Sequence, residues 1–139
     1  MIRLHHVSFL TKNIFAMKNF YSNIFNAKIA HKFINKSNKQ VYGYFLYLSK
    51  GTFIEIIKSE RQTSYKKLHS LNHFCVLASK YKFNIIYKKI KKTKNLKSEK
   101  KRGKTDRSMN FSFYDPDKNL CEVHLDDDFT ILKKYNKNI

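Results

Sequence analysis

The sequence has 139 residues, enough for one domain with a substantial core or for two small modules that share one. Its formal net charge is +19, with 29 lysines and arginines against 10 acidic residues, and only four of the basic residues are arginines. Because arginine binds phosphate and guanine in bidentate fashion, this balance indicates compositional drift and argues against a nucleic-acid partner. No stretch of 18 apolar residues occurs, so we expect no membrane span.

The first half of the chain predicts the element order β-α-β-β-β. Residues 2–10 alternate tightly enough for a strand that places the even-numbered side chains, His6 among them, on one face. Thr11 and Asn13 can cap the helix that follows, and Asn26 suits a left-handed C-cap because asparagine tolerates that conformation. The expected elements are strands at residues 2–10, 28–34, 41–48 and 52–58, with a helix from about 14 to 25.

A polar connection at residues 59–69 precedes a second run of the same element order. Its expected elements are strands at residues 70–78, 95–100, 108–114 and 119–125, with a helix from about 80 to 92. The segment Asp115 to Asn119 predicts a turn, with Asn119 at the position where left-handed geometry is tolerated. Between residues 88 and 107 the chain is densely basic, which is typical of a solvated surface segment. We therefore predict one domain over residues 1–139: a first module at about 1–58, the connection at 59–69, a second module at about 70–125 and a tail at 126–139.

The two halves repeat at an offset of 67 residues. Leu4 to Leu10 align with Leu71 to Leu77, and Tyr44 to Ile57 align with Phe111 to His124. The repeat matches His6 with His73 and Glu55 with Glu122. Each module thus offers one imidazole and one carboxylate at equivalent positions.

The two glutamates stand inside apolar runs. Glu55 lies within Phe53–Ile57, and Glu122 lies within Leu120–Val123. A buried carboxylate must be paired, coordinated or protonated, because an isolated buried charge is costly. The simpler interpretation is that each glutamate faces solvent while its apolar neighbours face a core, since charged residues are seldom fully buried.

The matched histidines favour a metal site over that simpler interpretation. If the first and last strands of each module are neighbours, each module holds one histidine beside one glutamate, and pseudo-twofold packing would bring all four together. Two imidazoles and two carboxylates suit one divalent ion such as Zn, Ni, Co, Fe or Mn. The candidate ligands are His6, Glu55, His73 and Glu122.

Five segments between residues 4 and 123 carry a resemblance to a known superfamily. They are Leu4-His5-His6-Val7, Phe20-Tyr21, Phe53-Ile54-Glu55-Ile56, Leu71-Asn72-His73 and the stretch from Phe113 to Val123. Together they resemble the vicinal oxygen chelate superfamily, which includes glyoxalase I, methylmalonyl-CoA epimerase, fosfomycin-resistance proteins, extradiol dioxygenases and bleomycin-binding proteins. In the most specific segment, the turn from Asp115 to Asn119, Lys118 replaces the glycine usual in that family.

The resemblance implies an α+β fold in which two tandem βαβββ modules form a cupped mixed sheet around a metal site. It also implies the ligand roles of His6, Glu55, His73 and Glu122. This ligand set resembles that of glyoxalase I, where a metal polarises a carbonyl or enediolate while a glutamate transfers protons. We therefore expect a redox-neutral isomerase or lyase that acts on a small carbonyl or oxyanion substrate, with Glu122 favoured as the base and Glu55 as the alternative.

Two residues differ from the glyoxalase I pattern. The arginine that the family places four residues after the first histidine is Leu10 here, and no asparagine follows Glu55 closely. These departures argue against a glutathione hemithioacetal as the substrate and leave the involvement of glutathione open. Methylmalonyl-CoA epimerase relatives generally have glutamine at the position of Glu55, so Glu55 argues against that branch. Extradiol dioxygenases need only two histidines and one carboxylate and would not need Glu55.

Other functions stay open at this point. The alternative of the same fold is an antibiotic-resistance transferase or a binding protein, and an extradiol-type dioxygenase or a basic nucleic-acid-binding accessory protein fits less well. For the enzyme we expect a small substrate, anionic or neutral, a cytoplasmic location and a homodimer.

Three further side chains are weaker candidates. Cys75 shares a strand face with His73 and could contact substrate, although it and Cys121 both have the pattern of reduced core thiols. His124 follows Glu122 on the same face and could carry protons or be structural. Arg107 could bind an anionic group of the substrate, or could belong to a merely solvated loop.

Overall fold

The computed structural model describes residues 4–59, 72–102 and 109–125, and the side chains of residues 99–102 are outside that description. The chain divides into two compact units, residues 1–68 and 69–139. We call the described residues of these units the first and the second module. In the described residues no helix is long and apolar enough to cross a membrane.

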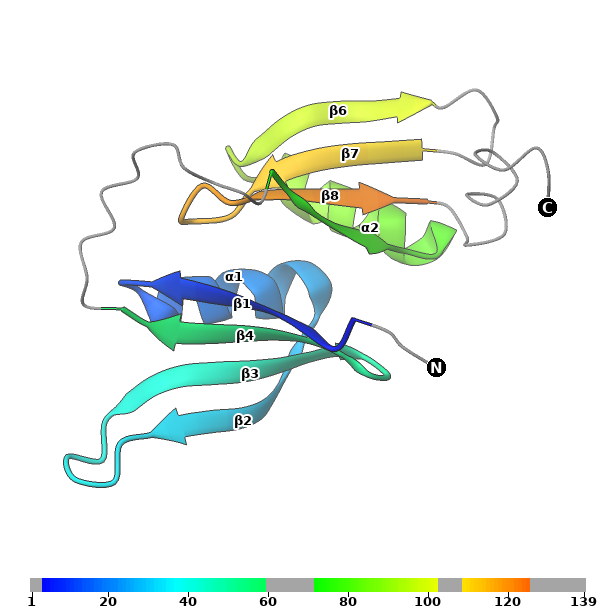
Figure 1. Ribbon diagram of the computed structural model, residues 1–139. Coiled ribbons are helices and arrows are strands. Elements are labelled where there is room, and N and C mark those ends of the chain that lie inside the picture. Colours follow the sequence, from blue (N-terminus) through cyan, green and yellow to red (C-terminus); the bar gives the residue numbers. More distant parts are fainter. Residues whose placement is uncertain (1–3, 60–71, 103–108, 126–139) are drawn as a thin grey trace. The chain divides into compact units, whose positions relative to one another are not determined.

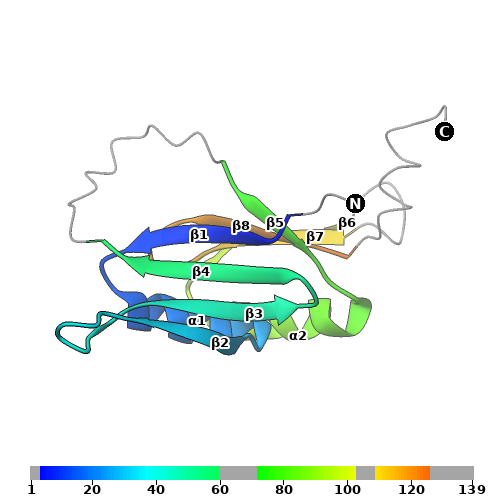
Figure 2. The same ribbon diagram turned by 60° about the horizontal axis from the view of Figure 1, so that its bottom comes forward.

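The first module is a four-stranded mixed sheet with one helix. Its elements are β1 (His6–Thr11), α1 (Ile14–Phe25), β2 (Lys28–Ile34), β3 (Val41–Ser49) and β4 (Thr52–Lys58). The strand order is β1-β4-β3-β2, and β1 runs parallel to β4 while the other pairs are antiparallel (Figure 2). The predicted elements are confirmed, except that β1 begins at His6 and not at residue 2.

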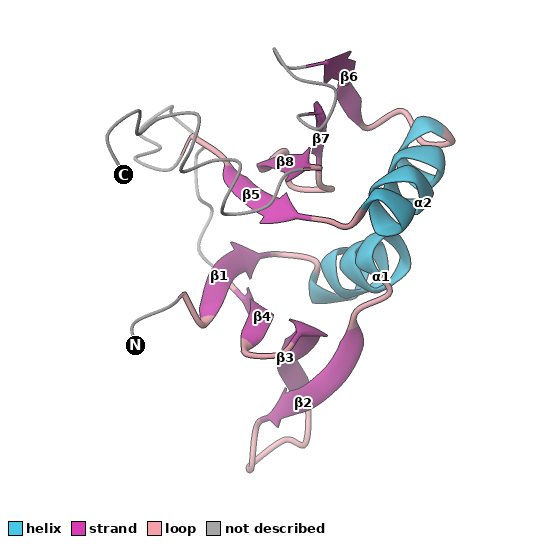
Figure 3. Ribbon diagram, turned by 90° about the vertical axis from the view of Figure 1, so that its right-hand side faces the viewer, coloured by secondary structure: helices cyan, strands magenta, loops and turns pink. Residues whose placement is uncertain are grey.

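Helix α1 has the ends that the sequence predicted. The side-chain oxygen of Asn13 accepts a hydrogen bond from the backbone amide of Ala16 at 3.0 Å, and Asn26 is left-handed with φ 56°. The helix packs on β3 and β4 through apolar side chains that recur at helical spacing (Figure 3). The buried core of this module includes Phe9, Ile14, Met17, Tyr21, Ile24, Leu46, Ile54 and Ile56.

The second module repeats the same architecture. Its elements are β5 (Phe74–Leu77), α2 (Lys80–Lys91), β6 (Leu96–Arg102), β7 (Met109–Tyr114) and β8 (Leu120–His124), with strand order β5-β8-β7-β6 (Figure 1). Its core includes Phe83, Ile86, Ile90, Phe111, Phe113, Cys121 and Val123. The predicted α+β fold with two βαβββ modules is confirmed, with each module forming its own four-stranded sheet.

The strand register confirms the 67-residue repeat. In the parallel pair β1·β4, Ser8 lies opposite Glu55, and in β5·β8, Cys75 lies opposite Glu122. Each residue of the second pair lies 67 positions after its counterpart in the first pair. The first and last strands of each module are therefore neighbours, as the metal-site hypothesis requires.

The turn between β7 and β8 differs from the prediction at one residue. Lys118, and not Asn119, is left-handed, with φ 67°. The buried carboxylate of Asp115 accepts hydrogen bonds from the backbone amides of Asp117 and Asn119 at 2.9 and 2.8 Å and from the side-chain amide of Asn119 at 2.8 Å. These bonds close a tight hairpin that sets the start of β8.

Candidate metal centre

The two glutamates lie on the sheet faces opposite the helices. In β4, Ile54 and Ile56 are buried in the core, and Glu55 between them is half-buried on the other face. In β8, Cys121 and Val123 are buried, and Glu122 is half-buried. Strand alternation therefore explains why a glutamate stands inside each apolar run: its side chain points to the face opposite that of its apolar neighbours.

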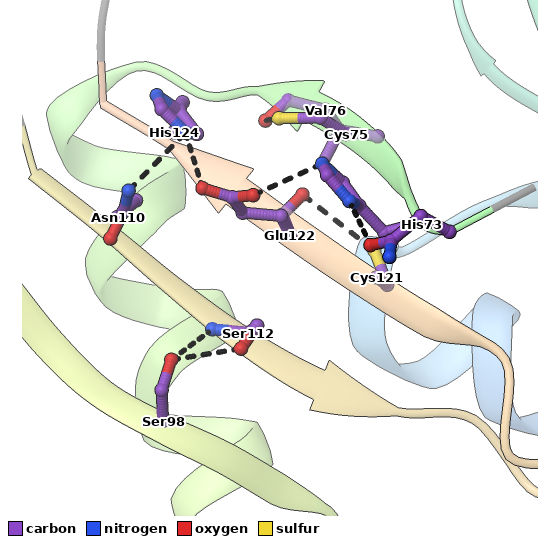
Figure 4. A network of polar contacts seen from close by, with 10 residues as sticks. His73, Cys75, Val76, Ser98, Asn110, Ser112, Cys121, Glu122 and His124 are labelled. Atoms are coloured by element: carbon purple, nitrogen blue, oxygen red, sulfur yellow. Dashed lines mark hydrogen bonds and ion pairs between the residues drawn. The ribbon is translucent and has the colours of Figure 1, made fainter.

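Glu122 is held between two imidazoles, as Figure 4 shows. Its Oε2 lies 3.3 Å from Nε2 of His73, and its Oε1 lies 2.5 Å from Nε2 of His124. The Glu122 side chain is 22% exposed. The second module therefore places one predicted histidine and one predicted glutamate side by side, with His124 as a second neighbour of the carboxylate.

Asn72 determines the tautomer of His73, that is, which ring nitrogen carries the hydrogen. The carbonyl oxygen of the Asn72 side chain lies 2.9 Å from Nδ1 of His73 and can only accept, so Nδ1 carries the hydrogen. In the neutral ring, Nε2 then directs a lone pair at Oε2 of Glu122. Two lone pairs at 3.3 Å repel unless a proton or a cation lies between them.

This pair fits a divalent metal ion. Nitrogen and oxygen donors that bind one ion at about 2.0–2.2 Å lie about 3–3.5 Å from each other, which matches the His73–Glu122 separation. The hydrogen bond from Nδ1 of His73 to Asn72 is the outer contact typical of a metal-binding histidine. Within the described ranges, however, no three His, Cys, Asp or Glu side chains are grouped so that they could hold a metal ion.

The first module does not repeat this contact. Nδ1 of His6 lies 3.0 Å from Nδ1 of His5, and its ring packs edge-on against Phe45 with centroids 5.6 Å apart. Neither a hydrogen bond nor an ion pair joins His6 to Glu55, and among the described residues Glu55 has no such partner. The structure thus brings together His73 and Glu122 but not His6 and Glu55, and the complete four-ligand set stays a prediction.

The two faces that carry the glutamates differ in chemistry. Around Glu55 the face is aromatic: Phe45 stacks on Phe53 with centroids 4.7 Å apart, and His5 lies 4.9 Å from Phe53. The repeat position of Phe45 is occupied by Ser112 in the second module, and that of Ile57 by His124. The face that carries Glu122 is therefore the more polar of the two.

Cys75 belongs to the face of Glu122 and not to the core. The thiol is accessible, so its interpretation as a core thiol is wrong, whereas Cys121 is fully buried. Desolvation by the surrounding protein and, secondly, the charge of Glu122 raise the pKa of Cys75 to about 11. Burial raises the pKa of Cys121 well above its usual value. Both cysteines are therefore neutral thiols at neutral pH, and Cys75 can contact a substrate but is a poor nucleophile.

Arg107, the other predicted substrate contact, lies outside the described residues. The sequence interpretation gave no role to Asn72 or Asn110, although both contact the site histidines. Asn72 precedes His73 within the repeat, and Asn110 lies opposite His124 in β7·β8. The position of Asn72 was visible in the sequence, but the contact of Asn110 depends on strand pairing.

Fold and site together define a tandem βαβββ protein with a histidine and a glutamate at matched positions of its two modules. The chain belongs to the Glyoxalase/Bleomycin resistance protein/Dioxygenase superfamily, whose family model matches residues 3–123. The resemblance inferred from the sequence is therefore confirmed. No curated protein matches the chain significantly.

Several solved structures share the fold. A FosX fosfomycin resistance protein from Listeria monocytogenes, a point mutant complexed with Mn(II) and 1S,2S-dihydroxypropylphosphonic acid, matches with TM-score 0.72 and 22% identity over 98% of this chain and 100% of that chain. FosX from Mesorhizobium loti matches with TM-score 0.65 and 20% identity over 96% and 99%. Lactoylglutathione lyase from Agrobacterium tumefaciens matches with TM-score 0.62 and 16% identity over 88% and 92%. At these identities the likeness establishes the fold.

Proposed function

We propose that this protein is a metal-dependent enzyme of glyoxalase type, a redox-neutral isomerase or lyase that acts on a small carbonyl or oxyanion substrate. The observation that carries the proposal is the convergence of Nε2 of His73 and Oε2 of Glu122 at 3.3 Å, with Asn72 holding the other ring nitrogen as a donor. In the proposal His6 and Glu55 complete the ligand set. The bound divalent ion would stabilise negative charge that develops on a substrate oxygen.

The contacts of the two glutamates favour different roles for them. His124 holds Oε1 of Glu122 and Oε2 faces Nε2 of His73, whereas Glu55 has neither an ion pair nor a hydrogen bond among the described residues. A proton acceptor needs a carboxylate oxygen that can approach the substrate. In this proposal Glu55 is therefore the metal ligand that also accepts and returns the substrate proton, and Glu122 is the ligand that stays fixed. The sequence alone favoured Glu122 as the base.

The aromatic face around Glu55 also bears on the substrate. Phe45 lies opposite Glu55 in the β3·β4 register and stacks on Phe53, so apolar rings share the sheet face of this carboxylate. Leu10, which is exposed at the end of β1, provides no cation for a glutathione carboxylate. The substrate that fits is small, with a carbonyl or oxyanion for the ion and no requirement for glutathione.

Metal content tests the proposal directly. Wild-type protein reconstituted with Mn(II) or Zn(II) and freed of excess metal should retain one ion per site, while Glu55→Ala and His73→Ala should retain less. His31→Ala is the matched control, because His31 is exposed on β2 and outside the ligand set. If the wild type retains no metal, or if His31→Ala loses as much metal as His73→Ala does, the proposal is wrong.

A second candidate is the opening of an epoxide phosphonate, favoured by the FosX structures that match nearly the whole chain. One of them contains Mn(II) and a dihydroxypropylphosphonic acid. Incubation of the Mn(II)-loaded protein with fosfomycin, followed by phosphorus NMR, distinguishes the two. A diol product supports the second candidate, and turnover of methylglyoxal with small thiols supports the first.

The predicted homodimer stays a prediction. Light scattering coupled to size-exclusion chromatography measures the mass directly, and a value of 16.7 kDa at micromolar concentration would contradict it.

A further inference from the structure

The carboxylate of Glu122 has one oxygen that a metal ion would use and one oxygen that His124 already occupies. Oε2 faces Nε2 of His73 at 3.3 Å, and Oε1 faces Nε2 of His124 at 2.5 Å. Because the carboxylate oxygen can only accept, Nε2 of His124 donates the hydrogen. Because the acceptor is a carboxylate, the hydrogen bond is charge-assisted, and such bonds are stronger than neutral ones.

We propose that His124 is a positioning residue that holds Glu122 by Oε1 and reserves Oε2 for the metal ion. The inference rests on the proposed metal site and assigns a new residue to it. Ligating carboxylates are commonly held by such outer hydrogen bonds, which fix the orientation of the ligand before the metal arrives. Without the contact, the carboxylate would be free to rotate and to bind through both oxygens.

The surroundings of His124 restrict its ring as well. His124 lies opposite Asn110 in the β7·β8 register and opposite Leu77 in the β5·β8 register. Its side chain is 25% exposed, so neighbouring groups surround most of the ring. The ring is therefore placed by a strand on each side and does not depend on a loop.

The repeat supplies an internal comparison. The position of His124 in the first module is Ile57, and that of Asn110 is Gly43, so Glu55 has no equivalent donor. Two carboxylates at matched backbone positions thus differ only in what surrounds them. This difference agrees with the proposed function, in which Glu122 is the fixed ligand and Glu55 is the ligand that also accepts the substrate proton.

The test compares three variants by titration of Mn(II) into metal-free protein, with free Mn(II) measured by electron paramagnetic resonance. His124→Leu should weaken Mn(II) binding by about 10- to 100-fold, the usual effect of removing an outer contact. His124→Gln keeps an N–H donor of similar reach and should restore most of that loss. Ile57→Leu, which places the same residue at the repeat position, should leave Mn(II) affinity unchanged.

Other outcomes overturn the inference. If His124→Leu binds Mn(II) as the wild type does, His124 does not hold the ligand. If His124→Gln loses as much affinity as His124→Leu, the histidine contributes shape and not a hydrogen bond. Thermal unfolding of each variant shows whether the fold itself has changed.

A measurement on the metal-free protein separates this inference from the proposed function. Proton–nitrogen correlation spectra of the imidazole rings should show hydrogen on Nε2 of His124, and the Glu122→Gln variant should shift that signal. If the wild type binds no Mn(II) but this signal is present and shifts, the metal function fails while the positioning contact is upheld. If Nε2 carries no hydrogen, or if Glu122→Gln leaves the signal unchanged, the positioning role is refuted.

Discussion

The left-handed residue in the last hairpin turn of each module provides a sharp test of the repeat. Gly51 and Lys118 are 67 residues apart and have φ values of 73° and 67°. A residue other than glycine in this conformation costs about 1–2 kcal/mol. Glycine removes that cost but gives the unfolded chain more freedom, which offsets about 0.4–1 kcal/mol. Lys118→Gly should therefore stabilise the protein by about 0.5–1 kcal/mol.

Urea unfolding followed by circular dichroism measures this difference. The reciprocal change, Gly51→Lys, should destabilise the protein by about the same amount, because it adds a side chain to a left-handed backbone. Lys50→Gly is the matched control: it removes a lysine from the neighbouring position, which has no positive φ. If Lys118→Gly is no more stable than Lys50→Gly, the left-handed conformation of Lys118 is not what limits stability, and the reasoning is refuted.

Three other substitutions or treatments have defined outcomes. Gly43→Ala should destabilise the protein by about 1–3 kcal/mol in urea unfolding, because its Cβ would lie 2.6 Å from a backbone carbonyl oxygen of β4; unchanged stability would contradict this close approach. Asp115→Ala should cost about 2–4 kcal/mol, because a buried carboxylate that accepts from two backbone amides and one side-chain amide is lost; a cost below that of an exposed Asp→Ala change would contradict it. In metal-free protein, iodoacetamide should alkylate Cys75 at pH 8 more slowly than it alkylates free cysteine, by on the order of 100-fold. The alkylation rate should rise until the pH passes about 11, and it should be faster in Glu122→Gln because the charge of Glu122 raises the pKa of the thiol. A rate that levels off near pH 9 would contradict the raised pKa.

The backbone of this protein was largely predictable because its signals are local. The Asn13 cap, the left-handed Asn26 and the strand Thr52–Lys58 lie where the sequence places them. These features depend on residues a few positions apart, so the sequence contains the information needed. The sequence did not predict the register of β1·β4 or β5·β8, but the repeat requires the two registers to be equivalent, and they are.

The predictions for Asn119 and Cys75 were wrong for the same physical reason: contacts with other residues decided between two conformations or environments that the residue type allows. Asn119 tolerates a left-handed conformation, but the carboxylate of Asp115 binds its backbone and side-chain amides and leaves that conformation to Lys118. Cys75 has apolar sequence neighbours, yet strand alternation places it beside Glu122. In both cases the residue type allowed two outcomes, and tertiary contacts selected one.

For the candidate site, the sequence predicted a set of residues, which stays a prediction, and did not predict their contacts. Spacing identified His73 and Glu122, and the structure brings them to 3.3 Å. The same spacing identified His6 and Glu55, but His6 contacts His5 and Phe45 instead. Equivalent backbone positions therefore do not ensure equivalent contacts, because an imidazole follows whichever aromatic or polar neighbour the adjacent strands provide.

This asymmetry explains how a duplicated module could support two different glutamate roles. A metal ligand gains from being held in one orientation before the metal binds, whereas a base must move toward the substrate and back. Glu122 is held by His124 through Oε1, and Glu55 lies on an aromatic face with neither an ion pair nor a hydrogen bond among the described residues. If this division is correct, transferring the donor to the first module through Ile57→His should restrain Glu55 and lower turnover without lowering metal affinity. Unchanged turnover together with a higher metal affinity would instead indicate that Glu55 acts chiefly as a ligand.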